Sequence, residues 1–588
     1  MTVRARSAQF AESHAGLLLS AAVVTSLLIV SLLIGQFGRI GPDGDDMMRL
    51  VQVRDLLNGQ GWFDLVQPRL GPDGGTLMHW SRLVDLPIAA IAHTLTPFIG
   101  QGAALRIAWT VWPLISVLIV VGGLVAGARA FGGRSVLLFA CLLGFAVLHR
   151  HFRFLPGAID HHNLQLGLLM LAAGSLLRRE HAGAMALAGA SLALAAAIGA
   201  EVHLFVVLMA GFVAVDWALT GEPAQRGAAV FGASFAAVLT AAFLATVPPL
   251  DYGIARCDAL DSVTLLAGLA GGVAFALAVQ ITSGKSIALR FAALANVAAI
   301  CAALVLVTGP HCLSNPLDSL SPQARDLWLA RVDEARPTLA YLRTGQLDEI
   351  LFRLGTPFAG LAAAGWLAWR RDEARAQLLF VLLLTAALLL SLYQTRFYVF
   401  GQLFAVLPLA VLAARAQSGG LGARLPRLSY LLVLLLSVPP LWSAAGAALS
   451  PPLAPSAGLQ AAAACNPPAA QAALAILPDG RVLAPATDAP DILLSTPHSV
   501  LYGHYHRNRA GIDAALAIFT SPPDAARPRL AAAGVDYLMV CPADIDMRFF
   551  AGYAPDGLIG RMLGGETPGW LEPVVSAGET TIYRVKPG

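Results

Sequence analysis

Long apolar runs return at short intervals over the first three quarters of the chain, and they constrain its fold more than any other feature. We count about thirteen runs near the roughly 20 residues that an α-helix needs to cross about 30 Å of hydrocarbon. They lie near residues 15–35, 104–128, 135–149, 164–178, 182–199, 203–219, 226–247, 262–281, 287–309, 355–370, 376–393, 398–415 and 428–448. Only 13% of the residues are charged, and the mean hydropathy is +0.68. The pattern therefore predicts a polytopic α-helical membrane protein.

Basic residues between the runs predict how the chain is oriented. With a cytoplasmic N-terminus, the connections that hold Arg178 and Arg179, and Arg370 and Arg371, are cytoplasmic too, as the positive-inside rule requires. An odd number of spans then places the acid-rich loops and the tail on the outer side. We expect a multi-pass protein of a bacterial inner (cytoplasmic) membrane, surrounded by membrane lipid, with its outer face in the periplasm. The net charge of +3 is small and scattered, which excludes a nucleic-acid partner.

The polar segments divide the chain into two predicted domains. Residues 1–448 form a membrane domain with outer loops at 36–103, 150–163 and 310–354, and residues 449–588 form a small extracytoplasmic domain. The tail alternates strand-like runs, such as RVLAP, VDYLMVC and TTIYRV, with alanine-rich helical stretches. This alternation predicts an α/β fold for the tail.

The six cysteines fall into two groups. Those outside the apolar runs are Cys257, Cys312, Cys465 and Cys541, and those within runs are Cys141 and Cys301. The first two flank a pair of consecutive runs and emerge on one face, and the next two lie in the tail. Two disulfides would form there in an oxidising compartment, with four free thiols as the alternative. The two cysteines within runs are interpreted as packing residues.

Acidic and histidine side chains gather in the predicted outer loops. These groups are Asp45 and Asp46, the run Asp160, His161 and His162, and Glu334. Carboxylates and an imidazole that lie close together at a membrane surface repel each other unless they are protonated or bridged by a cation. A divalent cation accepts both carboxylate and histidine ligands. The pattern therefore indicates a metal site. Helix caps for the aspartates, and a solvated surface position for Glu334, are the alternative interpretations.

Five short motifs, in order along the chain, resemble those of the catalytic subunit of oligosaccharyltransferase, a membrane glycosyltransferase of the GT-C class. The motifs read GDDMMRLVQVRD, PDGGTLMHWSRL, RFLPGAIDHHN, ARVDEARP and YQTRFYVFGQL. That family has thirteen spans and a C-terminal extracytoplasmic domain. The resemblance covers about residues 15–415 and implies a fold of GT-C type with about 13 transmembrane helices.

The resemblance also implies a metal-dependent transfer of a sugar from a polyprenyl-phosphate or polyprenyl-diphosphate carrier, with Mg or Mn as the metal. By position, Asp45 or Asp46 would bind the cation and orient the acceptor. Asp160 and His162 would be metal ligands. Glu334 would contact both metal and acceptor.

Arg396 would hold the phosphate of the carrier lipid, which agrees with its position on the outer side, against the inside bias of basic residues. His161 would be a neighbour of the metal ligands. Arg82, Glu201 and His203 are further candidates. The structural alternatives are pairing between Arg82 and Asp85, and helix capping or helix pairing by Glu201 and His203.

The tail departs from the family pattern. The family carries Trp-Trp-Asp-Tyr-Gly, which recognises the acceptor sequon Asn-x-Ser/Thr, whereas this chain offers only Asp488 at the corresponding place. We therefore expect a glycan, lipid or other protein acceptor. The segment TPHSVLYGHYHRN, with His504, His506 and Arg507, would contact the acceptor or the donor phosphate, or hold the tail by hydrogen bonds.

Other functions predict different patterns. A transporter or flippase of lipid-linked glycans needs ionisable groups near the bilayer midplane, whereas this chain gathers its acids in outer loops. A metal-independent GT-C enzyme that uses a polyprenyl-monophosphate sugar would keep full activity after chelation. A non-catalytic membrane scaffold would not need the acidic positions.

Overall fold

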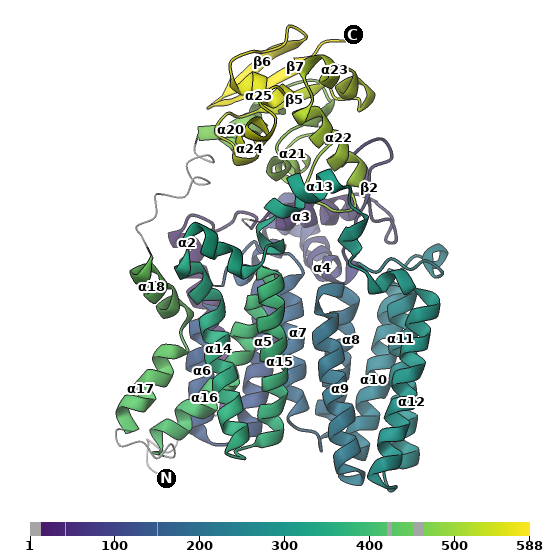
Figure 1. The fold of residues 1–588 in the computed structure, drawn as a ribbon, viewed down its shortest axis with the longest axis vertical. Coiled ribbons are helices and arrows are strands. Elements are labelled where there is room, and N and C mark those ends of the chain that lie inside the picture. The colour runs from purple at the N-terminus through teal and green to yellow at the C-terminus, as the bar shows by residue number, and fades with distance from the viewer. Residues whose placement is uncertain (1–12, 42, 150, 420–425, 451–463, 588) are drawn as a thin grey trace. The chain divides into compact units, whose positions relative to one another are not determined.

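The computed structural model describes residues 13–41, 43–149, 151–419, 426–450 and 464–587. They form two compact units (Figure 1). The first, here called the helical unit, takes its described residues from 1–40, 80–314 and 333–451. The second, here called the mixed unit, takes them from 41–79, 315–332 and 452–588.

Within the part of the chain that the structure describes, nine helices are long and apolar enough to cross a membrane. They are α2 (Ala15–Leu33), α5 (Gln101–Phe131), α9 (His203–Thr220, with the preceding turn η2, Ala200–Val202), α10 (Glu222–Thr246), α11 (Ser262–Thr282), α12 (Ile287–Thr308), α14 (Leu347–Trp369), α15 (Ala374–Tyr393) and α16 (Tyr398–Gln417). Each coincides with a predicted apolar run. The prediction of a polytopic α-helical membrane protein is therefore confirmed.

Four other predicted runs form shorter or bent helices. They are α6 (Arg134–Leu148), α7 (His162–Leu176), α8 (Ala182–Ile198), and the pair α17 (Pro426–Leu436) and α18 (Pro439–Leu449). The segments Ser429–Leu436 and Pro439–Leu449 meet at 84°, because two prolines begin the second one and prevent a continuous helix. The total of thirteen spans stays a prediction. One further helix, α4 (Arg82–Ile99), lies in the predicted outer loop and contains Pro87 and Pro97.

Close helix contacts fix the position of α7, whose first residue is His162. A Cβ atom on Gly174 of α7 would lie 2.1 Å from the carbonyl oxygen of Gly123 in α5, and one on Gly123 would lie 2.4 Å from the Met170 carbonyl. Only glycine allows the two backbones to approach this closely, as in many membrane helix pairs. The C-terminal half of α7 is therefore packed directly against α5.

The mixed unit contains a five-stranded sheet with the strand order β4-β3-β5-β7-β6. The strands are β3 (Arg481–Leu483), β4 (Ser499–Val500), β5 (Tyr537–Val540), β6 (Leu571–Ala577) and β7 (Thr580–Val585). β3 is parallel to β4 and β5, and β7 is antiparallel to β5 and β6. The three strand-like runs read from the sequence become β3, β5 and β7, so the predicted α/β fold of the tail is confirmed.

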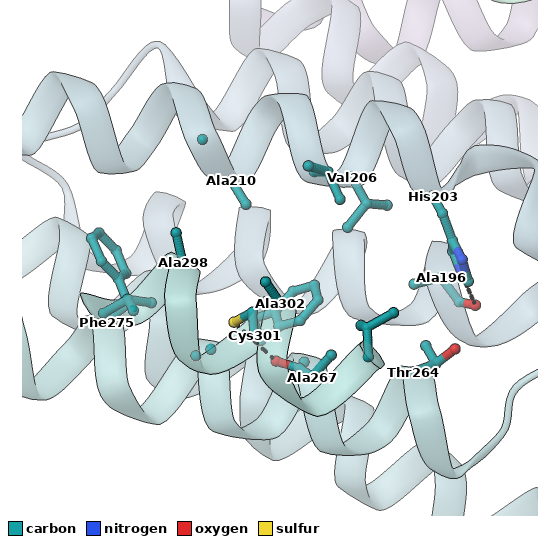
Figure 2. Close-up of a pocket in the computed structure, with 18 of the residues that line it drawn as sticks. Ala196, His203, Val206, Ala210, Thr264, Ala267, Phe275, Ala298, Cys301 and Ala302 are labelled. Carbon is teal, nitrogen blue, oxygen red and sulfur yellow. Dashed lines mark hydrogen bonds between the residues drawn. The ribbon is translucent and has the colours of Figure 1, made fainter. Parts of the chain in front are cut away.

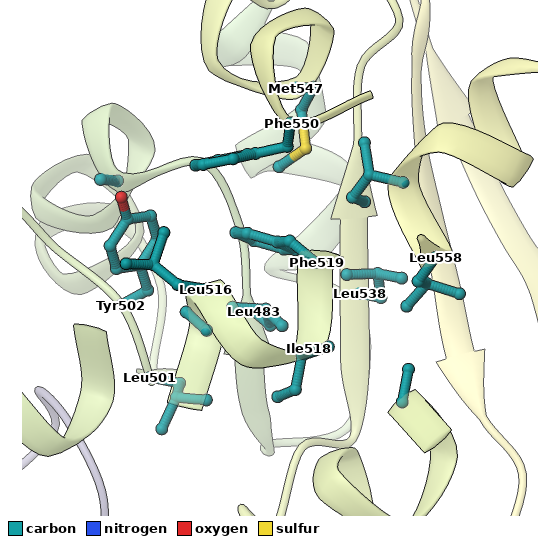
Figure 3. Close-up of a cluster of buried hydrophobic side chains, with 14 of the residues drawn as sticks. Leu483, Leu501, Tyr502, Leu516, Ile518, Phe519, Leu538, Met547, Phe550 and Leu558 are labelled. Atoms are coloured by element: carbon teal, nitrogen blue, oxygen red, sulfur yellow. The ribbon is translucent and has the colours of Figure 1, made fainter. Parts of the chain in front are cut away.

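Aromatic and aliphatic side chains fill the core of the mixed unit around Phe519 and Phe550, whose rings lie 5.2 Å apart (Figure 3). Leu320, Leu327 and Trp328, from the long loop before α14, are buried in the same core. Each fully buried side chain of this size stabilises the fold by roughly 1.5–3 kcal/mol. Apolar burial therefore explains why residues 315–332 group with the tail.

The structure contains both predicted disulfides, Cys257–Cys312 in the helical unit and Cys465–Cys541 in the mixed unit. Cys141 and Cys301 are free and partly buried. Cys301 packs between α12 and α11, where its sulfur lies 3.6 Å from the Ala267 carbonyl, in agreement with a packing role.

Candidate functional site

A short loop between α6 and α7 presents the Asp160-His161-His162 run. Phe154 and Ile159 are buried and anchor the loop on either side of Gly157. Gly157 has a φ of +97°, which a residue with a side chain rarely adopts, and its N–H donates to the Trp109 carbonyl of α5 at 3.0 Å. The turn places Asp160 two residues before the first residue of α7.

Neither aspartate motif caps a helix. The N-cap residue of α7 is His161, which makes no capping hydrogen bond, so the capping alternative for Asp160 is wrong. In the mixed unit, α3 (Gly44–Leu57) is capped by Asp43, whose carboxylate accepts from the Asp45 N–H at 3.1 Å. Asp45 and Asp46 instead occupy the first turn of α3. Their participation in a metal site stays a prediction.

His161 lies between two carboxylates in the helical unit. Its Nδ1 lies 2.6 Å from Asp160 Oδ1, and its Nε2 lies 2.8 Å from Glu201 Oε1. Burial alone would lower the pKa of His161, but the two carboxylates outweigh it and raise that pKa to about 10. The imidazolium donates a hydrogen bond to each carboxylate, and this explains how three buried polar groups coexist at the end of an apolar helix.

His162 belongs to the same cluster. Its ring nitrogens lie 3.5 Å from Asp160 Oδ2 and 3.7 Å from Glu201 Oε1. One ligand atom from each of Asp160, His161 and His162 falls within 4.8 Å of the other two. Carboxylate oxygen and imidazole nitrogen are both ligands of Mn²⁺ and Zn²⁺, while Mg²⁺ prefers oxygen alone. The donor set therefore fits a divalent cation.

Glu334 forms an ion pair that the sequence did not predict. It lies in the turn η7 (Asp333–Ala335), and its Oε1 accepts from the guanidinium of Arg153 at 2.7 Å. Burial would raise the pKa of Glu334, but the charges of Arg153, His162 and Arg396 together outweigh burial and lower that pKa, so the carboxylate is ionised at neutral pH. Glu334 is thus not merely a solvated surface residue. Arg153 could have been found from the sequence, because it is an arginine on the predicted outer side, within the motif RFLPGAIDHHN that also holds Asp160 and His162.

A small cavity joins these groups. Arg153, His162, Glu201 and Arg396 line it together with Phe397 and Phe400. Arg153 and Arg396 therefore line the same space as His162 and Glu201, two members of the carboxylate–imidazole cluster. Arg396 stands in the turn η9 (Thr395–Phe397), directly before α16. The cavity measures about 10 Å³, which is room for about one water. Guanidinium groups offer paired N–H donors to a phosphate.

The remaining candidates of the helical unit have structural partners. Arg82 donates to Asp85 Oδ2 at 3.1 Å, and both side chains are buried, so the predicted pairing is confirmed. A ring nitrogen of His203 lies 3.2 Å from the Ala196 carbonyl. Glu201, which the sequence ranked only among the secondary candidates, is a direct partner of His161 and His162.

The polar cluster of the tail contacts other segments of the mixed unit. His504 accepts a hydrogen bond from the Trp328 indole at 2.8 Å. The ring of His506 lies 4.5 Å from that of His79, and Arg507 donates to the Met78 carbonyl at 3.1 Å. These contacts tie the tail to residues 41–79 and 315–332. A role in acceptor or phosphate binding stays a prediction.

Asp488 ends the turn η10 (Ala486–Asp488) and precedes α21 (Ala489–Ser495). Burial, with Asp544 and Asp491 nearby, raises the pKa of Asp488 to about 7. Its predicted contact with the acceptor also stays a prediction.

A larger cavity of about 880 Å³ lies between α9, α10, α11 and α12 (Figure 2). Its lining is almost wholly apolar and includes Val206, Phe275 and Ala302. The polar lining residues His203 and Asp261 lie at the first residue of α9 and at the N-cap of α11. Among the residues that line it, none is an arginine, lysine or glutamate.

Comparison with known proteins gives the fold. No protein-family model matches the chain, and no curated protein matches its sequence. Among solved structures, the chain aligns with the oligosaccharyltransferase AglB from Archaeoglobus fulgidus, in complex with an inhibitory peptide and a dolichol-phosphate. The TM-score is 0.62 and the sequence identity is 16%, and the alignment covers 96% of this chain and 74% of that chain. The apo form of the Archaeoglobus fulgidus enzyme aligns with a TM-score of 0.63 and 16% identity, over 90% of this chain and 70% of that chain. The chain has the fold of an oligosaccharyltransferase.

ArnT from Cupriavidus metallidurans also aligns, over 97% of this chain and 98% of that chain, but with a TM-score of 0.38 and 13% identity. The fold of GT-C type expected from the five sequence motifs is confirmed by the archaeal structures. At 16% identity the likeness concerns the fold.

Proposed function

We propose that the chain is a GT-C glycosyltransferase of the bacterial inner membrane, which moves a sugar from a polyprenyl-phosphate or polyprenyl-diphosphate carrier to an acceptor at the periplasmic face. One observation carries the proposal. In a chain with an oligosaccharyltransferase fold, His162 and Glu201 of a carboxylate–imidazole cluster line the same small cavity as two arginines. Solved structures with this fold support it, since one AglB structure contains a dolichol-phosphate and another contains Zn and sulfate.

The cluster fits a divalent cation, with Mn²⁺ favoured over Mg²⁺ because histidine is among the donors. Asp160, His162 and Glu201 would hold it. The contribution of Asp45 or Asp46 stays a prediction from the sequence motifs. Such a cation would stabilise negative charge that develops on the departing phosphate or orient the acceptor. The ionised Glu334 accepts a hydrogen bond from the acceptor's nucleophilic group and takes its proton as the new bond forms.

Arg396 and Arg153 hold the anionic head of the donor. A guanidinium offers two parallel N–H donors to a phosphate, and inside a partly dehydrated cavity these charge-assisted bonds are stronger than at an exposed surface. Arg153 also pairs with Glu334 at 2.7 Å. The same side chain therefore contacts both the donor phosphate and the carboxylate that takes the proton from the sugar acceptor. The apolar cavity between α9 and α12 can take the carrier's hydrocarbon chain.

The acceptor is a glycan, a lipid or a protein group other than the asparagine sequon. The tail lacks the Trp-Trp-Asp-Tyr-Gly pattern of the resembling family, so the peptide pocket of that family has no counterpart in the sequence. Asp488, His504, His506 and Arg507 remain the proposed acceptor contacts of the tail.

A transporter is the weaker candidate. A translocation path needs polar groups along its length. The cavity between α9, α10, α11 and α12 is instead lined mainly by apolar side chains. A metal-independent enzyme that uses a monophosphate carrier is tested by chelation.

The test uses the purified full-length chain in lipid nanodiscs, with undecaprenyl-diphosphate-linked and undecaprenyl-monophosphate-linked sugars as separate donors and a bacterial envelope extract as the source of acceptor. We expect release of the carrier phosphate, loss of release with EDTA, and recovery with Mn²⁺. Asp160→Ala and Glu334→Ala should each abolish transfer while the protein still elutes as a folded species. Unchanged turnover in both variants, or full activity of the wild type in EDTA, would contradict the assigned roles.

A further inference from the structure

The turn that carries Glu334 stands at the point where the chain passes from one compact unit to the other. Residues 315–332 belong to the mixed unit, and Asp333 is the first residue of the returning segment of the helical unit. Glu334 is therefore one residue beyond that boundary. An ionised group that acts on an acceptor must be held within a fraction of an ångström, so something must fix this turn to the helical unit.

The turn is joined to the Arg396 turn at two points. The Thr395 N–H donates to the Arg336 carbonyl at 2.7 Å. The Thr338 hydroxyl donates to the Ser391 carbonyl at 2.6 Å and lies 3.2 Å from the Thr395 hydroxyl, and Thr338 is fully buried. Both points lie beside Arg396, the predicted phosphate ligand.

Tyr341 holds the other end of the turn. Its phenol donates to Asp333 Oδ2 at 2.8 Å and accepts from the guanidinium of Arg353 in α14 at 3.2 Å. The Arg353 guanidinium also lies over the Tyr341 ring, 4.5 Å from its centre, and pairs with Glu349 one turn earlier in α14. Burial raises the pKa of Tyr341 to about 12, so the phenol keeps the proton that it donates.

From these contacts we infer that Thr338 and Tyr341 are positioning residues for Glu334, which fasten its turn to α14 and to the Arg396 turn on both sides of the carboxylate. The two residues touch neither donor nor acceptor. They hold the turn within the helical unit, so that Glu334 keeps its 2.7 Å contact with Arg153. The inference rests on the proposed function for its catalytic consequence, but the fastening itself is a property of the fold.

The test compares Tyr341→Phe and Thr338→Val with Thr338→Ser, which keeps the hydroxyl, and with Tyr252→Phe, a partly exposed tyrosine of the helical unit distant in sequence from the turn. Hydrogen exchange is measured on the full-length chain for peptides that cover residues 333–344 and α14. We expect faster exchange in 333–344 for Tyr341→Phe and Thr338→Val, without a change in α14. Thr338→Ser and Tyr252→Phe should resemble the wild type.

Turnover with the polyprenyl-linked donor gives the second readout. Tyr341→Phe and Thr338→Val should lower kcat by about 10- to 100-fold, the range for a misplaced catalytic group. The donor KM should stay within about threefold, since the phosphate ligands are intact. A merely structural role would instead lower the active fraction and leave kcat per active site unchanged.

Unchanged exchange in residues 333–344 would overturn the fastening, and faster exchange with an unchanged kcat would overturn the positioning role. If the wild type itself releases no carrier phosphate, the proposed function fails and the catalytic consequence falls with it. In that case the exchange data still decide whether Thr338 and Tyr341 hold the turn.

Discussion

Replacing Asp488 with asparagine should stabilise the mixed unit at neutral pH. Burial, with Asp544 and Asp491 adding their negative charges, raises the Asp488 pKa from 3.8 to about 7. A shift of this size corresponds to at most about 4 kcal/mol, at 1.36 kcal/mol per unit. Because the Asp488 side chain is still partly accessible to solvent, screening reduces the expected gain in the free energy of unfolding to about 2 kcal/mol.

The sign of the pH dependence follows from the raised pKa. Below about pH 4 the carboxyl is protonated in both the folded and the unfolded state, so wild type and Asp488→Asn should have equal stability. Between about pH 4 and 7 the unfolded chain loses its proton while the folded chain keeps it, and the wild type becomes progressively less stable. Above about pH 7 the difference is constant.

Hydrogen exchange of peptides in β3 and β5 measures this free energy without unfolding the membrane helices. Asp491→Asn, whose carboxyl pKa is raised to about 6, should give a smaller gain, and Asp479→Asn, at an exposed position, should give none. Equal protection of wild type and Asp488→Asn at pH 8, or a difference that persists at pH 4, would refute the reasoning.

Three further changes have direct consequences. Glu201→Gln removes a carboxylate from His161 and His162, so the Mn²⁺ concentration for half-maximal activity should rise at least about tenfold, measured by metal titration. Arg396→Ala should raise the donor KM more than it lowers kcat, measured by steady-state kinetics. Phe519→Ala should destabilise the mixed unit by about 3–5 kcal/mol, read from hydrogen exchange in β5, because it opens a cavity in a fully buried core.

Much of the fold follows from local sequence, because apolar run length and strand alternation are properties of short segments. The nine long helices and β3, β5 and β7 were predicted in this way. The bend between α17 and α18 has a local signal too, in two consecutive prolines, but the apolar run passes straight across it. Run length therefore overstates the continuity of a helix.

The site could not be predicted in full from the sequence, because its residues come together only through tertiary contacts. Asp160 and His162 are neighbours in sequence, but Glu201 is 40 residues from His161, and Glu334 is 181 residues from Arg153. Loops at the ends of different helices bring these groups together, and no periodicity in one loop predicts its partner in another. The capping alternative failed for a related reason, since Asp43, one residue before the first turn of α3, supplied the cap instead of Asp45 or Asp46.

The charge balance of the small cavity predicts that metal and donor bind cooperatively. Three carboxylates, from Asp160, Glu201 and Glu334, and the His161 imidazolium lie in or next to the cavity that Arg153 and Arg396 line. A divalent cation is attracted by the carboxylates but repelled by the arginines, and a phosphate experiences the reverse. When both bind, each ligand offsets the charge that repels the other. This effect is large in a partly buried site, because little water is present to weaken the interaction between charges. Coupling of this kind typically changes each affinity by about 5- to 150-fold.

The measurement is the Mn²⁺ affinity of the full-length chain in nanodiscs, with and without undecaprenyl phosphate, by isothermal titration calorimetry. Undecaprenyl phosphate should tighten Mn²⁺ binding by at least about fivefold, and Mn²⁺ should tighten the binding of undecaprenyl phosphate by the same factor, because binding linkage is reciprocal. Undecaprenol, which has the same chain without the phosphate, is the control and should leave the Mn²⁺ affinity unchanged. Independent binding of the two ligands would mean that the phosphate does not reach the cavity that Arg153 and Arg396 line.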